Sequence, residues 1–131
     1  MTDIFHPSSR PIDHLARCGA DDAPALLIGD KVTSFAALDA GVGRLAAWLL
    51  EQAGGPGERV ASWSAKTRVA CLMPLAAARA GLIHVPVNPL LKGPQVAHIL
   101  SDSGATLLVT NGARAEMLGD GLPDQCVVQD L

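Results

Sequence analysis

Short apolar runs alternate with amphipathic segments along the chain. Residues 82–87 form an apolar run without polar alternation, which is typical of a strand buried on both faces. In the next segment, over 93–103, apolar and polar side chains fall on opposite sides of a helix. Gly104 ends this helix, and a second apolar run covers 105–110. This order predicts a βαβ unit with a right-handed crossover in a parallel sheet.

The same alternation extends over the rest of the chain. We predict helices at 12–18, 35–53, 66–80 and 114–118, and strands at 24–28, 31–33, 59–63 and 126–128. The first two strands flank Gly29 and Asp30, a two-residue turn typical of a hairpin. Ser34 and Ser64 are predicted N-caps of the helices that follow them. Strands that alternate with helices predict an α/β fold, a doubly wound, mainly parallel sheet with helices on both faces.

Three residues inside the predicted helices are unfavourable for a helix. Gly41 and Gly43 each weaken the helix over 35–53 by about 1 kcal/mol relative to alanine, unless a neighbour packs closely against them. Pro74 cannot donate a hydrogen bond to the carbonyl of Ala70, so we expect a bend in the helix over 66–80. Residues 1–11 are expected to form an extended arm.

Composition limits the class of protein. The 131 residues are enough for one domain, and with 49% hydrophobic but only 3% aromatic residues its core must be aliphatic. A net charge of −3 without a lysine or arginine cluster gives no nucleic-acid surface. No secretory signal and no stretch of about 20 apolar residues is present, which predicts no membrane span. Cys18, Cys71 and Cys126 are odd in number and widely spaced, so we expect reduced thiols in a cytoplasmic protein.

No residue pattern in the sequence identifies a catalytic site or a metal site. Residues 63–67 (WSAKT) are similar to the end of a phosphate-binding loop, but non-glycine residues occupy its glycine positions, which favours a helix cap. The four histidines, including His6, lack the spacing of metal ligands. We expect His84 to be packed with a local hydrogen-bond partner and His98 to be solvated, and Trp48 and Trp63 to lie in the core.

A resemblance to a known family covers nearly the whole chain. Residues 85–111, VPVNPLLKGPQVAHILSDSGATLLVTN, resemble the N-terminal subdomain of AMP-forming acyl-CoA synthetases and related adenylate-forming ligases, as do TSFAAL and GERVASWSAK upstream. The wording NPLLKGPQVAHIL further resembles ligases that accompany bacterial exosortase and exopolysaccharide systems. The resemblance implies that residues 1–131 are a single domain, the N-terminal fragment of an AMP-binding ligase domain.

The resemblance also implies a reaction. Ligases of this family activate a carboxylate with ATP as an acyl-adenylate, release pyrophosphate and pass the acyl group to a thiol, so ATP, Mg²⁺ and CoA are implied for the full-length enzyme. The family's Ser/Thr/Gly-rich loop, ribose-binding aspartate and mobile C-terminal domain do not occur in this sequence, and we expect the fragment alone to be inactive. In similar CoA ligases a basic residue after the Asn-Pro pair lies near the CoA nucleotide. Leu90 takes that position here, and the nearest charge, Lys92, is the candidate on the CoA side.

Two other functions stay open. The chain could be a free-standing non-catalytic module that assembles with a partner chain, or a small nucleotide-binding domain, although no glycine-rich loop supports the latter. As partners we expect the remainder of a ligase chain and a second copy. The helix over 35–53 has a broad apolar arc, and uncovered apolar surface of this kind predicts self-association, most simply as a symmetric dimer.

Overall fold

A four-stranded parallel sheet forms the body of the molecule. The computed structural model describes residues 9–130, so His6 and most of the predicted N-terminal arm lie outside the described residues. The strands are β3 (Arg59–Trp63), β4 (Ile83–Val87), β5 (Leu107–Thr110) and β6 (Val127–Asp130), in the spatial order β4-β3-β5-β6. All three pairings are parallel. The predicted doubly wound α/β fold is confirmed.

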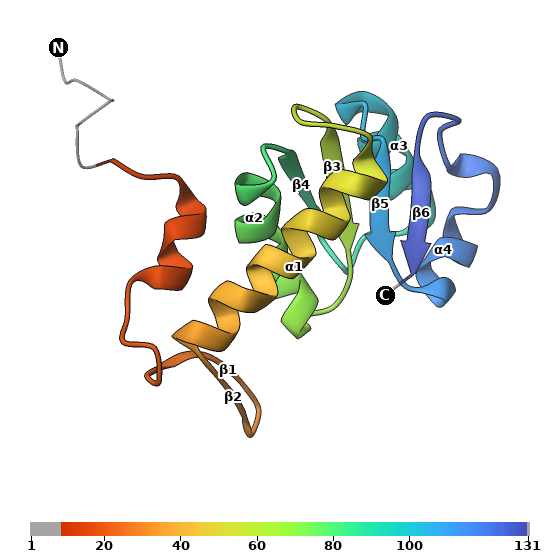
Figure 1. Ribbon diagram of the computed structural model, residues 1–131. Helices are drawn as coiled ribbons and strands as arrows, with labels where there is room; N and C mark the ends of the chain where they lie inside the picture. The colour runs from red at the N-terminus through yellow and green to blue at the C-terminus, as the bar shows by residue number, and fades with distance from the viewer. Residues whose placement is uncertain (1–8, 131) are drawn as a thin grey trace, which may run out of the picture.

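Helices cover both faces of this sheet (Figure 1). On one side lie α1 (Phe35–Ala53) and α2 (Arg68–Arg79) with the 3₁₀ helix η1 (Ile12–Arg17), and we call this the α1/α2 face. On the other lie α3 (Gly93–Ser103), α4 (Gly112–Leu118) and the short η2 (Gly119–Gly121), which form the α3/α4 face. Each face has its own cluster of buried apolar side chains, with alternate residues of β3 in each.

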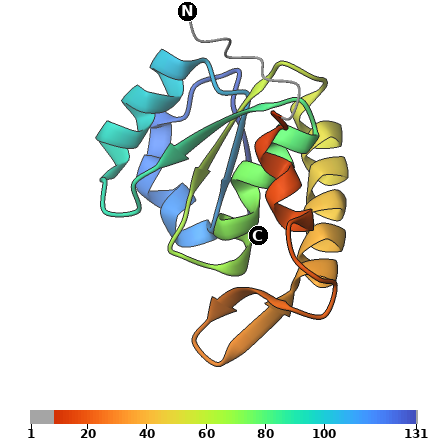
Figure 2. The same cartoon turned by 90° about the vertical axis from the view of Figure 1, so that its left-hand side faces the viewer.

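A separate hairpin precedes α1. Strands β1 (Pro24–Ile28) and β2 (Lys31–Ser34) pair in antiparallel register around the predicted two-residue turn, where Gly29 takes a positive φ of 56°. Figure 2 shows the hairpin projecting beyond the end of α1, away from the sheet. Leu27 and Val32 are register partners and are 67% and 60% exposed. The hairpin therefore carries a pair of apolar side chains that are largely exposed to solvent.

The longest helix, α1, begins and ends as predicted. The Ser34 hydroxyl accepts a hydrogen bond from the Ala37 N–H at 3.2 Å, and Gly54 ends the helix with φ of 86°. A Cβ at Gly41 would lie 2.8 Å from Arg68 Nη2 and 3.1 Å from Leu72 Cδ2. Glycine at this position thus allows α1 and α2 to approach closely. This contact is the closely packed neighbour that offsets the cost of a glycine inside the helix.

Helix α2 begins later than the sequence indicates. Thr67, not Ser64, is the N-cap: its backbone is extended, and its hydroxyl accepts a hydrogen bond from the Ala70 N–H at 3.3 Å. The predicted start at residue 66 and the Ser64 cap are therefore wrong, because residues 65 and 66 form a bend, closed by the Thr67 N–H donating to the Ala65 carbonyl at 2.8 Å, before the helix begins. The helix continues through Pro74 to Arg79, and the expected bend stays a prediction.

Two further differences concern β4 and α4. Strand β4 lies at the edge of the sheet, where Ile83 is 48% exposed, so the expectation of a strand buried on both faces is wrong. An apolar sequence does not distinguish an edge strand from an interior one. Helix α4 starts at Gly112, two residues earlier than predicted, because the Asn111 side chain accepts a hydrogen bond from the Arg114 N–H at 2.9 Å.

An arginine ties η1 to both helices of its face. Arg79 Nε donates to Asp13 Oδ2 at 3.0 Å, and Arg79 Nη2 donates to Asp39 Oδ1 at 2.7 Å. The hydrogen bond from Arg79 holds the pKa of Asp39 below its ordinary value, with a further contribution from Arg17. The charge on Arg79 thus fastens η1, α1 and α2 to one another.

Candidate functional site: the carboxyl edge of the sheet

The topology creates a crevice at the carboxyl ends of β3 and β5. These strands are neighbours, yet α2 follows β3 onto one face of the sheet and α4 follows β5 onto the other. Two chain segments therefore leave the same edge in opposite directions. In open α/β sheets, ligands bind at such a switch point.

A cavity of about 190 Å³ lies in this crevice. Inside it, the Thr110 hydroxyl donates to the carbonyl of Trp63 at 2.7 Å, while Thr67 and Asn111 cap α2 and α4. Three of its polar side chains are thus already engaged in holding the strands and helix ends. The lining residues are Ser64, Ala65, Thr67, Val69, Val109, Thr110 and Asn111.

Trp63, whose carbonyl accepts the hydrogen bond from Thr110, places its side chain in the core of the α3/α4 face. It is fully buried, as predicted, and its indole Nε1 has no hydrogen-bond partner among the described residues. The guanidinium of Arg114, in the first turns of α4, lies 5.8 Å from the centre of the indole ring. Sequence reasoning did not find this pair, since nothing in the spacing of residues 63 and 114 links them.

The loop between β4 and α3 presents Lys92 at the same edge. The Asn88 side chain accepts a hydrogen bond from the Leu90 N–H at 2.9 Å and fixes the turn after β4. Lys92 is exposed at the N-cap position of α3, where its backbone N–H donates to Gln95 Oε1 at 3.0 Å. Lys92 takes part in none of the ion pairs of residues 9–130, and it lies on the side of the sheet opposite α2.

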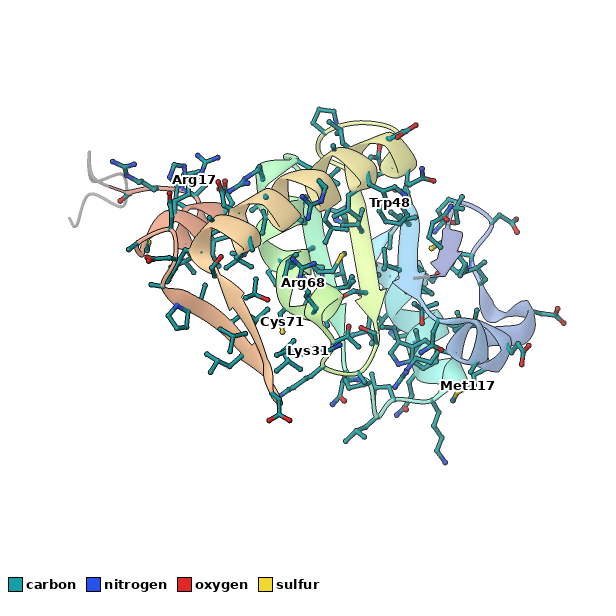
Figure 3. The ribbon with its side chains drawn as sticks, turned by 60° about the horizontal axis from the view of Figure 1, so that its bottom comes forward. Arg17, Lys31, Trp48, Arg68, Cys71 and Met117 are labelled. Atoms are coloured by element: carbon teal, nitrogen blue, oxygen red, sulfur yellow. The ribbon has the colours of Figure 1, made fainter. Side chains whose placement is uncertain are left out.

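The start of α3 is fixed by a close contact with α4. A Cβ at Gly93 would collide with the carbonyl of Met117, a residue labelled in Figure 3. Glycine is therefore required here for α3 and α4 to pack together. This contact positions the neighbouring Lys92 relative to the sheet.

His84 lies on the other face of the sheet and has a local partner, as predicted. Its Nε2 lies 2.7 Å from the Ser62 hydroxyl across the β3–β4 pair. Burial lowers the pKa of His84, so the neutral imidazole is favoured. The predicted solvated position of His98 is also confirmed, because this residue is exposed on α3.

Two chemical features limit what these residues can bind. Among residues 9–130, no group of three or more His, Cys, Asp or Glu side chains could hold a metal ion. Three of the four polar side chains that line the crevice are engaged, which leaves Ser64 and no cation of the lining to meet a triphosphate. The described residues thus do not fit Mg²⁺ and ATP, and we assign no step of phosphate chemistry to them. Nor is any helix of the described part both long and apolar enough to cross a membrane.

The α1/α2 face carries two open apolar cavities that share Arg68. One of about 280 Å³ lies between α1 and α2 and is lined by Trp48, and one of about 430 Å³ lies beside the hairpin and is lined by Lys31 and Val32. Figure 3 labels Lys31, Arg68 and Trp48 along this side of the molecule. Trp48 is half-buried, so its predicted place in the core is only partly confirmed.

The three thiols divide between the faces. Cys18 and Cys71 are exposed and line one apolar cavity of about 340 Å³ on the α1/α2 face. Cys126 is buried within the α3/α4 face, and burial raises its pKa to about 11. All three are free cysteines.

Comparisons with known proteins find a family of AMP-binding enzymes and, within the matches, synthetases and ligases. The family model described as AMP-binding enzyme matches residues 13–130. FR901469 synthetase of Dothideomycetidae sp. (strain 11243) is 33% identical over 84% of this chain, which spans 1% of that protein. The fatty acid–[acyl-carrier-protein] ligase ScoC of Streptomyces coeruleorubidus is 34% identical over 82% of this chain and 19% of its own length. The benzoate CoA ligase of Burkholderia xenovorans LB400 shares the fold with a TM-score of 0.78 at 23% identity, over 88% of this chain and 24% of that one.

Proposed function

The chain belongs to the AMP-binding enzyme family, and we infer that it is the N-terminal part of an ATP-dependent ligase that activates a carboxylate as an acyl-adenylate and transfers it to a thiol. The observation that carries this proposal is the family match over 13–130 combined with the small share of each relative that the chain spans. Such a chain forms one wall of a larger active site. The remainder of the ligase is then its first partner.

Within this proposal, the described residues supply shape rather than phosphate chemistry. ATP and Mg²⁺ would be held by the remainder of the ligase, because three of the four polar side chains that line the crevice between β3 and β5 are engaged and no cation lines it. Lys92 is our candidate contact for CoA. Its exposure at the carboxyl edge and its positive charge suit a phosphate of the CoA nucleotide. No residue of this chain is assigned a catalytic role.

The substrate class follows from the relatives' names. A fatty acid ligase and a benzoate ligase both act on carboxylates, so we propose a fatty or aryl carboxylate, with CoA or a carrier-protein thiol as acceptor. The resemblance to exosortase-associated ligases favours a bacterial, cytoplasmic enzyme. For the chain by itself, we propose a second copy as partner.

The reading frame beyond Leu131 gives the sharpest test. A continuing frame that encodes a Ser/Thr/Gly-rich loop followed by lysine is expected, and a native stop codon would instead favour the alternative, a non-catalytic module that assembles with a partner chain. The complete product should exchange pyrophosphate into ATP with fatty or aryl acids. The 131-residue chain alone should give no exchange above a no-protein control.

A Lys92→Ala variant of the complete enzyme separates the CoA contact from adenylation. Losing one charge-assisted contact should raise KM for CoA by roughly tenfold and leave pyrophosphate exchange unchanged. Arg59→Ala, an exposed arginine at the opposite end of β3, is the matched control. An unchanged KM for CoA would remove Lys92 from the site.

A further inference from the structure

The outer side of α1 is an uncovered surface. Figure 2 shows α1 along the outer edge of the molecule, with no element of the described chain on its far side. The residues there recur at intervals of three and four, as a single line along a helix requires. The line consists of Ala37, Ala40, Arg44, Trp48 and Glu51, and its Arg44 and Trp48 also border the open cavity between α1 and α2.

Two opposite charges stand on this line. Arg44 and Glu51 are seven residues apart, which is about two helical turns or 10.5 Å along the axis. Both are exposed. The ion pairs of the described residues join Arg17 and Arg79 to Asp13 and Asp39, and neither Arg44 nor Glu51 takes part in them. Each charge is thus available to a partner.

The spacing makes the line complementary to itself. If two α1 helices pack antiparallel about a two-fold axis between residues 47 and 48, Arg44 of each copy lies opposite Glu51 of the other. A two-fold interface repeats every contact twice, so both ion pairs form together. Trp48, beside the axis, lines the open cavity between α1 and α2 together with Leu45 and Leu72, so the second copy covers this cavity. We propose that the outer face of α1 binds a second copy of this chain in this antiparallel arrangement.

Charge order favours a second copy over an unrelated partner. An unrelated antiparallel helix would need a basic residue followed seven positions later by an acidic one. This is the order that α1 itself supplies. This surface gives the proposed second copy its place on the chain. It concerns the 131-residue chain and is independent of ligase activity, so a failed adenylation assay and a failed association assay are separate results.

Sedimentation velocity over a range of concentrations tests the proposal directly. The chain should sediment as a dimer at the higher concentrations and dissociate on dilution. Arg44→Glu places like charges opposite each other twice and should raise the dimer dissociation constant at least about tenfold at low salt. Glu51→Arg should do the same. The double variant R44E/E51R restores both pairs in reversed order and should return the dissociation constant to within about threefold of the parent.

Lys92→Glu is the matched control, since it makes the same charge change on the α3/α4 face and should leave association unchanged. Circular dichroism of each variant confirms that the substitution leaves the fold intact. A chain that is monomeric at every concentration would overturn the proposal. So would a dimer that Arg44→Glu leaves as tight as the parent, or a double variant that fails to regain association.

Discussion

The two faces of the sheet differ in how completely their apolar side chains are covered. On the α3/α4 face, Trp63 and Leu100 are fully buried, and Gly93 fits against a backbone carbonyl of α4 so closely that no side chain could be added. On the α1/α2 face, cavities remain open to solvent, and Trp48 is only half-buried. Lys31, Arg44 and Arg68 border these cavities without an ion pair among the described residues.

This difference separates folding from association. A closed face gains its stability within the chain, because its apolar side chains already lie out of water. An open face, whose cavities are lined by apolar side chains and bordered by unpaired cations, gains more stability when a further surface covers it. The α3/α4 face should therefore control stability, and the α1/α2 face should control what the chain binds.

Truncating one tryptophan on each face should give the largest contrast. Trp63→Ala leaves a cavity in the closed core and should lower the free energy of unfolding by about 3–5 kcal/mol. Trp48→Ala removes a half-exposed ring and should cost about 1 kcal/mol. Urea unfolding monitored by circular dichroism measures both values.

Trp63→Phe sharpens the result. Because the indole Nε1 of Trp63 has no partner among the described residues, its loss forfeits no hydrogen bond, and phenylalanine should cost less than half as much as alanine. A Trp48→Ala variant as unstable as Trp63→Ala would mean that the α1/α2 face is as closed as the other.

A smaller effect should follow from pH. The pKa of His84 in the folded chain lies below the ordinary 6.5, so below pH 6.5 the unfolded chain takes up a proton that the folded chain does not. The free energy of unfolding should then fall as pH drops from 6.5 toward the folded pKa. For a half-buried imidazole the loss is at most about 1 kcal/mol.

Urea midpoints at pH 7.5 and 5.5, for the parent and for His84→Gln, measure this loss. The variant keeps a polar group beside Ser62 but does not titrate, so it should lose less stability between the two pH values. His98→Gln, on the exposed side of α3, is the control and should behave like the parent. Identical pH dependence in parent and His84→Gln would show that the imidazole titrates alike in both states.

Sequence signals that lie within a few residues predicted the helices and strands. Features that depend on distant parts of the chain were missed. The hairpin, α1 and α3 were predicted because their turns and caps lie within a few residues of the segments that they delimit, as with Ser34 and Gly104. The edge position of β4 was missed because strand order depends on where the chain returns, which an apolar run does not encode. The choice of Thr67 over Ser64 as a cap likewise depends on the bend at residues 65 and 66 that separates β3 from α2.

The candidate site was less predictable for the same reason. Its crevice joins Ser64 to Asn111, and the ion pair that anchors η1 joins Asp13 to Arg79, which lies 66 residues further along the chain. No periodicity connects such positions. The family resemblance supplied the fold and the placement of Lys92 after β4, but it could not show which face would stay open.

A thiol-reactivity assay should have the smallest effect on stability, because it probes the two faces without a substitution in either. Cys18 and Cys71 are exposed on the α1/α2 face and should react rapidly with a thiol-specific disulfide reagent at pH 8, giving two fast equivalents per chain. Cys126 lies in the closed core, and a pKa of about 11 leaves only about 0.1% of it as the reactive thiolate at that pH. It should react only when urea unfolds the chain, which brings the total to three. Cys71→Ser should lower the fast count to one, while Cys126→Ser should leave it at two. Three fast equivalents in the native chain would mean that the α3/α4 face opens readily, and the contrast between the two faces would then be one of shape but not of stability.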